Sequence, residues 1–174
     1  MTSAARGIDV RWPSATGPTA PAGKVQTPLL LNKGTSPRHE RRLGVAAPPP
    51  AASVAAWLAA QEGSRVYLTA IGAAELRLGV ALLPAGRRRD TLEVAIDAML
   101  AEDFRRRILP FDKAAAHAYT AIAAARRAAG RPISQSDAHI AAIALACDAS
   151  LATRDIADHE GCGLTLIDPW VAGR

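Results

Sequence analysis

Cysteine is almost absent from this sequence, which holds only Cys147 and Cys162 among its 174 residues. Two cysteines make no disulfide framework, and they lack the paired spacing of a zinc site. Residues 1–30 contain no continuous apolar segment behind a basic start, as a secretory signal requires. No apolar run reaches the roughly 18 residues that a membrane span needs. We therefore expect a cytoplasmic protein without membrane contact, with Cys147 as a small core residue on the apolar face of a helix.

A basic excess is missing from most of the chain, although the net charge is +5 and the pI is 9.9. Residues 1–50 hold seven Lys/Arg and two Asp/Glu, whereas residues 51–174 hold fourteen of each. The high pI therefore does not indicate a basic RNA-binding surface on the folded part. Two triplets, Arg87–Arg89 and Arg105–Arg107, flank a predicted helix. They are interpreted either as solvated helix ends or as contacts to an RNA backbone or an acidic partner.

The composition changes near residue 50. The first 50 residues hold eight of the twelve prolines and show no sustained helical or strand period, and Leu29–Leu31 is their only strand-like piece. We expect an irregular, basic segment over residues 1–49 and one folded domain over residues 50–174. From residue 51, strands alternate with helices, which predicts a parallel α/β sheet with helices packed on it. Helices are expected at 51–62, 70–83, 86–106, 112–129 and 134–147, and strands at 65–69, 108–111, 150–153 and 164–167.

Two of these elements bring a pair of carboxylates together. Ser134 or Ser136 is suited to cap the helix that contains Asp137, and Asp155 follows the next strand. About ten helical residues travel roughly 15 Å, and four extended residues return roughly 13 Å, so Asp155 comes back beside Asp137. The pair is suited to bind a hard cation such as Mg²⁺. Alternatively, Asp137 is a first-turn helix charge and Asp155 a solvated loop residue.

Several separated segments carry a family resemblance. They are Tyr67–Ile71, Ala74–Leu83, Ile108–Asp112, Gly130–Asp137, Leu151–Asp155 and Asp168–Trp170. In order and spacing they resemble a PIN domain, and the chain is similar to the VapC ribonuclease toxins of bacterial type II toxin–antitoxin pairs, especially their FitB-like branch. The resemblance covers residues 50–171.

The resemblance implies a PIN-like (Rossmann-like) three-layer α/β/α fold with a short central parallel sheet. It implies RNA cleavage with Mg²⁺ or Mn²⁺ held by acidic residues, which are Glu75, Asp137 and Asp155 in this sequence. Clustered carboxylates repel one another, and a divalent cation relieves that repulsion and activates a water for attack on a phosphodiester. The implied partners are a VapB-type antitoxin, RNA and a second copy of the chain in a homodimer.

Other polar residues of this region are weaker candidates. Asp148 and Asp158 are interpreted as turn or surface charges, with a metal-binding role as the alternative. His139 lies two positions beyond Asp137, so a helix points it about 200° away, and a surface or partly buried role is favoured over that of a base. Thr153 and Arg154 are candidates for contact with metal-bound water or RNA.

The family's first acidic ligand is missing. In the family, the first strand ends in Asp-Thr-Asn-Val, and alignment back from Trp57 without a gap places that aspartate at Arg38. We therefore expect the first strand to be replaced or disrupted. One possible set of codons for Ser36–Ala46, read one nucleotide later, encodes Val-Leu-Asp-Thr-Asn-Val-Val-Ser-Glu-Leu. Our hypothesis is that residues up to about Pro48 are a frame-shifted translation, which nucleotide sequencing of codons 30–55 tests.

Two functions remain open on the sequence. The first is a metal-dependent ribonuclease toxin, impaired by loss of the first ligand but retaining Glu75, Asp137 and Asp155. The second is a catalytically inactive PIN remnant that acts only by binding an antitoxin or by dimerising.

Overall fold

Five short parallel strands form the centre of the protein. The computed structural model describes residues 29–31 and 52–171. The strands are β1 (Leu29–Leu31), β2 (Val66–Thr69), β3 (Ile108–Leu109), β4 (Ser150–Ala152) and β5 (Leu166–Ile167). Their order across the sheet is β3-β2-β1-β4-β5. The predicted parallel α/β sheet is confirmed.

The middle strand comes from the proline-rich first third of the sequence. Leu30 of β1 pairs with Tyr67 of β2 on one side and with Leu151 of β4 on the other. A central strand satisfies its neighbours' backbone groups on both sides, and three leucines suit a position covered on two faces. Leu29–Leu31 thus holds the central position of the sheet, although it lies in the segment that was expected to be irregular. That the family's own first strand is replaced or disrupted stays a prediction. The rest of residues 1–49, including the proposed frame-shifted stretch Ser36–Ala46, lies outside the described residues.

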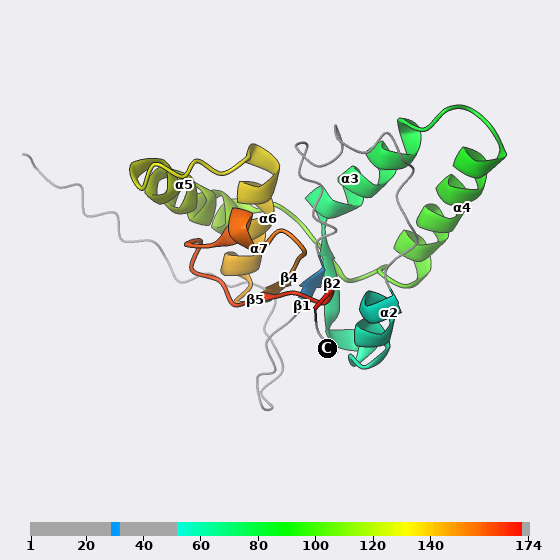
Figure 1. The fold of residues 1–174 in the computed structure, drawn as a ribbon, viewed down its shortest axis with the longest axis horizontal. Helices are drawn as coiled ribbons and strands as arrows, with labels where there is room; N and C mark the ends of the chain where they lie inside the picture. The colour runs from blue at the N-terminus through cyan, green and yellow to red at the C-terminus, as the bar shows by residue number, and fades with distance from the viewer. Residues whose placement is uncertain (1–28, 32–51, 172–174) are drawn as a thin grey trace, which may run out of the picture.

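Helices cover both faces of this sheet (Figure 1). On one side lie α5 (Lys113–Ala128), α6 (Gln135–Ala146) and the short α7 (Ile156–His159). On the other lie α2 (Ala52–Ala59), α3 (Ala70–Ala81) and α4 (Arg87–Glu102). A short 3₁₀ turn, Gly63–Arg65, leads into β2. The predicted three-layer α/β/α arrangement is therefore confirmed.

Side chains that alternate along the strands pack into two separate cores, one on each face of the sheet. Leu68 packs with Ala73 and Leu100 beside α3 and α4, whereas its neighbour Tyr67 packs against the cluster around Ile140 and Leu151. Successive side chains of a strand point to opposite faces, so each short strand contributes to both layers. The α6 layer is the more completely buried, since Ile140 and Leu151 are both 0% exposed. This packing holds the ends of α6 and β4 at fixed positions.

Side-chain caps begin the helices where the sequence places them. The Thr69 hydroxyl accepts from the Gly72 N–H at 2.9 Å, and an Asp112 carboxylate oxygen accepts from the Ala115 N–H at 2.9 Å. Of the two candidates at α6, Ser134 is the cap. Each cap satisfies a backbone N–H that has no partner within the helix.

The prediction of Cys147 as a core residue is wrong. Cys147 is exposed, because α6 ends at Ala146 and the chain turns at Asp148, whose φ is +48°. Among the described residues, no helix is both long enough and apolar enough to span a membrane.

Candidate functional site

The predicted acidic residues lie at the carboxyl-terminal edge of the sheet. Thr69 ends β2 and caps α3, the helix that contains Glu75. Asp155 comes three residues after the end of β4, and Asp137 lies in the first turn of α6. In open parallel sheets this edge is where ligands bind, because loops and helix N-termini converge there. The fold therefore delivers all three residues to one region.

Asp137 is held in place by its own helix cap. The Ser134 hydroxyl donates to Asp137 Oδ2 at 2.6 Å and accepts from the Asp137 N–H at 3.1 Å. These two bonds fix the carboxylate against the first turn of α6 and leave Oδ1 on its other side. The positive end of the helix dipole also favours a negative charge at this position.

Glu75 reaches the same region from the opposite layer. Glu75 is half-buried, and its Oε1 accepts a hydrogen bond from the hydroxyl of Ser136, the residue before Asp137. This bond joins α3 to α6 across a separation of 61 residues. Ser136 therefore orients Glu75 toward the site without being the helix cap that the sequence also allowed.

Asp155 experiences the charge of its acidic neighbours. Burial raises the pKa of its carboxyl above the usual value, and the negative charges of Asp158 and then Asp137 raise it further. The Asp155 N–H donates to Thr153 Oγ1 at 3.1 Å, and Thr153 is fully buried. Asp155 thus lies within electrostatic range of Asp137. Thr153 supports the turn after β4 and is not open to solvent.

His159, which the sequence did not single out, lies between Asp155 and Asp137. Its ring is fully buried, with Nδ1 3.0 Å from the backbone carbonyl oxygen of Asp155 and Nε2 4.0 Å from Asp137 Oδ1. A separation of four residues on a helix would have placed His159 over Asp155, but no helix was predicted at Ile156–His159. His159 therefore contacts one acidic residue and faces the other.

A buried arginine holds α7 against the rest of the protein. Arg126 on α5 is 6% exposed and donates to the carbonyl oxygens of Glu160, at 2.6 Å, and Asp158, at 3.3 Å. These carbonyls come at the end of α7, where a helix leaves its acceptors without internal partners. In sequence, Arg126 looked like one more basic residue near the end of α5, and no local pattern distinguishes it.

The remaining candidates take structural or surface positions. His139 is half-buried and packs between the rings of Phe111 and Tyr119, with centroid distances of 4.6 and 4.8 Å, as its helical phase predicted. Arg154 is exposed and Asp158 is half-buried. Asp148 is exposed in the turn after α6, in agreement with its interpretation as a turn charge.

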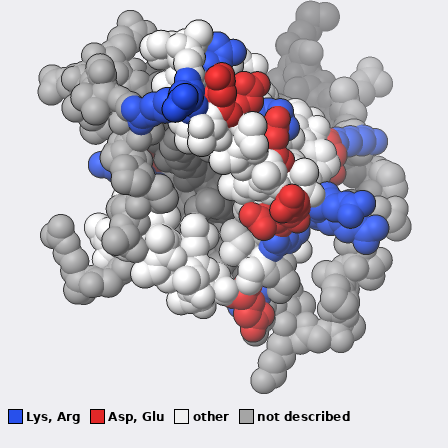
Figure 2. Space-filling model, turned by 90° about the vertical axis from the view of Figure 1, so that its right-hand side faces the viewer, with Lys and Arg blue, Asp and Glu red and all other residues white. Residues whose placement is uncertain are grey.

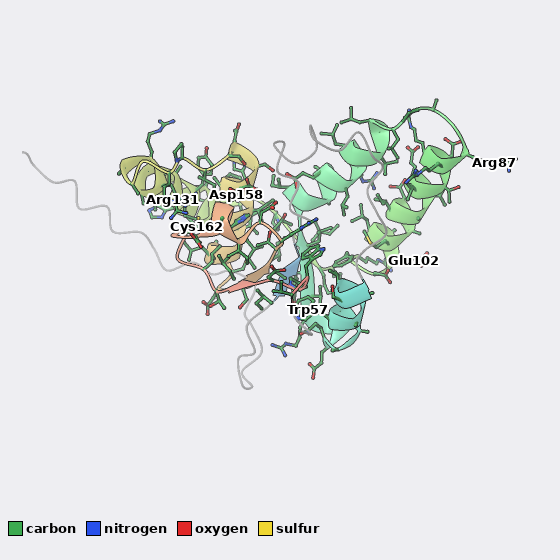
Figure 3. The ribbon with its side chains drawn as sticks, in the orientation of Figure 1. Trp57, Arg87, Glu102, Arg131, Asp158 and Cys162 are labelled. Carbon is green, nitrogen blue, oxygen red and sulfur yellow. The ribbon has the colours of Figure 1, made fainter. Side chains whose placement is uncertain are left out.

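The arginine triplets around α4 lie away from the acidic edge. Arg87 and Glu102, at the two ends of α4, are on the opposite side of the molecule from Asp158 (Figure 3). On the α4 side, basic and acidic side chains lie next to one another and form no single basic surface (Figure 2). Arg107 lies over the Phe104 ring, 5.4 Å from its centre. These positions favour the interpretation as helix-end charges.

The donors at the acidic edge fit a divalent cation in chemistry and charge. Asp137 and Asp155 offer carboxylate oxygens whose mutual repulsion a cation relieves, and the buried Nε2 of His159 has no hydrogen-bond partner among the described residues. Within the described ranges, three or more such side chains do not converge into a ready-made cage. A bound ion would therefore complete its coordination with water or with movement of the carboxylates.

A sequence model of the family described as PIN domain matches residues 44–157, which include Glu75, Asp137 and Asp155. The chain belongs to the PIN-domain family.

Three curated relatives of this PIN-domain protein are closely similar to it. Plasmid stability protein StbB of Pseudomonas syringae pv. tomato is 44% identical over 144 residues, covering 83% of this chain and 99% of the relative. VapC ribonuclease Y4jK of Sinorhizobium fredii is 39% identical over 121 residues, covering 70% and 86%. Toxin FitB of Neisseria gonorrhoeae is 37% identical over 123 residues, covering 71% and 88%.

The PIN fold also agrees in three dimensions. The structure of FitAB bound to an IR36 DNA fragment contains a chain that matches with a TM-score of 0.70 at 34% identity, covering 82% of this chain and 95% of that chain. The resemblance to VapC and FitB toxins is confirmed. This protein is a VapC/FitB-type PIN domain, from a family of ribonuclease toxins of toxin–antitoxin systems.

Proposed function

We propose that this chain is a metal-dependent endoribonuclease toxin whose centre is formed by Glu75, Asp137 and Asp155. The observation that carries the proposal is that Asp137 and Asp155 both lie against the buried His159 at the carboxyl edge of the sheet, while Ser136, beside Asp137, hydrogen-bonds Glu75. Carboxylates gathered in this way repel one another and suit a cation, here Mg²⁺ or Mn²⁺.

Each residue has a distinct part in the proposed chemistry. Asp137 and Asp155 supply oxygen donors, one fixed by Ser134 and the other at the end of β4. Glu75, oriented by Ser136, lies on the α3 side and is placed to accept a proton or a water hydrogen bond. When bound, a divalent cation supplies a more acidic water and neutralises charge on the phosphodiester. Half-burial of Asp155 and Glu75 strengthens these interactions relative to bulk water.

The partner that we propose is a VapB-type antitoxin, with a homodimer of the toxin in the complex. The FitAB structure supports this, since a chain in it shares 34% identity with this one over 82% of its length. We assign no DNA contact to the α4 face, because basic and acidic side chains lie next to one another there (Figure 2).

The proposal is tested with the full chain on a fluorescently labelled single-stranded RNA, in Mn²⁺, Mg²⁺ or EDTA. Asp137→Asn should lower the cleavage rate at least about 100-fold, equal to about 2.7 kcal/mol of transition-state stabilisation. Asp148→Asn is the matched control, because its carboxylate is exposed and asparagine tolerates its left-handed φ. Equal cleavage by both variants, or cleavage that persists in EDTA, would contradict the proposal.

A second candidate function is an inactive PIN remnant that only binds its antitoxin. It is favoured by the absence of the family's first aspartate, whose aligned position is Arg38, and by the lack of three converging donor side chains in the described part of the chain. A chain that binds antitoxin in a pull-down but cleaves no RNA with either metal would establish the remnant.

A further inference from the structure

The buried Nε2 atom of His159 faces the acidic edge and lacks a hydrogen-bond partner among the described residues. The side chain is 0% exposed, and Nε2 has no hydrogen-bond partner among the described residues. An unpaired buried polar atom costs about 1–3 kcal/mol, so such atoms generally have a ligand or a purpose. Asp137 Oδ1 lies 4.0 Å from Nε2, which is beyond hydrogen-bond distance.

The other ring nitrogen decides what Nε2 can offer. Nδ1 lies 3.0 Å from the backbone carbonyl oxygen of Asp155, and a carbonyl oxygen only accepts. Nδ1 therefore donates its hydrogen, and in the neutral imidazole Nε2 keeps a lone pair. Histidines that bind metals usually donate one ring N–H to a backbone carbonyl or a carboxylate and use the other ring nitrogen as the ligand, and His159 has this arrangement.

The distance between the two potential donors agrees with a shared ion. Bonds from a metal to imidazole nitrogen or carboxylate oxygen are about 2.0–2.2 Å, so two donors that share one ion would lie no more than about 4.4 Å apart. Nε2 and Asp137 Oδ1 are 4.0 Å apart. Because Ser134 holds Oδ2 of the same carboxylate, Oδ1 is the oxygen that faces the imidazole.

We propose that His159 Nε2 and Asp137 Oδ1 together bind the divalent ion of this centre, and that the imidazole makes the site select first-row transition-metal ions over Mg²⁺. Mg²⁺ prefers six oxygen ligands in octahedral geometry, whereas imidazole favours Co²⁺, Ni²⁺ and Zn²⁺. The inference rests on the proposed metal-dependent function and adds a donor and a metal preference to it. His159 is thereby assigned a binding role that its position on a four-residue helix does not suggest.

The test compares Co²⁺ with Mg²⁺ binding to the full chain by isothermal titration calorimetry, with no RNA present. In His159→Asn, the asparagine N–H₂ can still donate to the Asp155 carbonyl, but the Nε2 lone pair is gone. We expect Co²⁺ affinity to fall at least about tenfold while Mg²⁺ affinity changes less than about twofold. His117→Asn, which removes an exposed histidine of α5, is the control and should change neither affinity.

The alternatives give different results. A parallel fall in the Co²⁺ and Mg²⁺ affinities would show that His159 only holds Asp155 and Asp137 in place. Unchanged affinities would show that His159 has no contact with the ion. Either result overturns the inference about His159 but does not contradict the proposed nuclease function. Absence of any divalent binding by the wild-type chain overturns both. If His159→Asn does not fold, ¹⁵N NMR of the wild-type chain during Zn²⁺ titration decides, because coordination must shift the His159 Nε2 resonance and leave Nδ1 protonated.

Discussion

Asp155 is the residue at which function and stability oppose each other. Its pKa is raised, chiefly by burial and then by Asp158 and Asp137, although Arg154 and a charged His159 act in the opposite direction. The folded chain thus retains a proton on Asp155 at pH values where the unfolded chain has released it. By linkage, stability falls as pH rises from the ordinary aspartate pKa, about 3.9, through the raised folded value, and stays lower above it.

Removal of this charge should therefore stabilise the protein without metal. We expect Asp155→Asn to raise the melting temperature at pH 7 by about 2 °C, a modest value because the side chain is only half-buried. The difference should vanish near pH 3, where the wild-type carboxyl is protonated in both states. Circular dichroism melts in EDTA between pH 3 and 8 measure it, with Asp148→Asn as the exposed control. A lower melting temperature for Asp155→Asn at pH 7 would refute the argument.

At the scale of elements, α7 is a single turn that depends on a residue far away in sequence. It spans only Ile156–His159, too short to be stable from its own hydrogen bonds. Arg126 supplies the missing partners by donating to the carbonyls of Asp158 and Glu160, and Arg131 pairs with Glu160 at 3.0 Å on the surface. The buried guanidinium matters more than the exposed pair, because surface ion pairs contribute about 0–1 kcal/mol.

Replacement of this guanidinium should loosen α7 and the site beside it. We expect Arg126→Met to lower the free energy of unfolding by about 2 kcal/mol, since two buried carbonyl oxygens lose charge-assisted hydrogen bonds. Arg127→Met, its exposed neighbour on the same helix, should change stability by less than about 0.5 kcal/mol. Urea denaturation of the wild type and of the two variants measures the changes in the free energy of unfolding. Equal midpoints for the two variants would show that Arg126 does not hold α7.

Elements governed by local rules were predictable, and those that depend on distant contacts were not. The Ser134 cap, the helix after it and the return of Asp155 to Asp137 follow from residue type and from the rise per residue of helix and strand. His159 and α7 escaped prediction, because the contacts that bury them come from Arg126, more than 30 residues earlier. Cys147 was misplaced because the helix end was set one residue too late.

On the scale of the whole molecule, β1 joins the two halves of the sheet. β2 and β3 lie on one side of it and β4 and β5 on the other, so the strands that precede α3 and Asp155 are connected through Leu29–Leu31. The sequence marked Leu29–Leu31 only as a strand-like piece of an irregular segment, because three leucines are too short to show a strand period. Its place is set by pairing with β2 and β4, which come much later in the chain.

A proline in this strand should therefore prevent folding. Leu30→Pro removes the backbone N–H of a residue that pairs between β2 and β4, and proline is excluded from central strands. We expect this variant to lose its cooperative thermal transition, whereas Leu30→Val, which keeps the N–H and favours strands, should retain one. Differential scanning calorimetry of both variants gives the answer. A wild-type transition in Leu30→Pro would show that the sheet does not need this strand.

The place of β1 also fixes when the protein can become active during its synthesis. Its partner β4 is made about 120 residues later, which takes a ribosome on the order of ten seconds. During that interval the emerging chain has neither the second half of the sheet nor the Asp137–Asp155 pair. Translation that stops early therefore releases a fragment without the acidic edge. If the protein cleaves RNA as we propose, only a finished copy can do so.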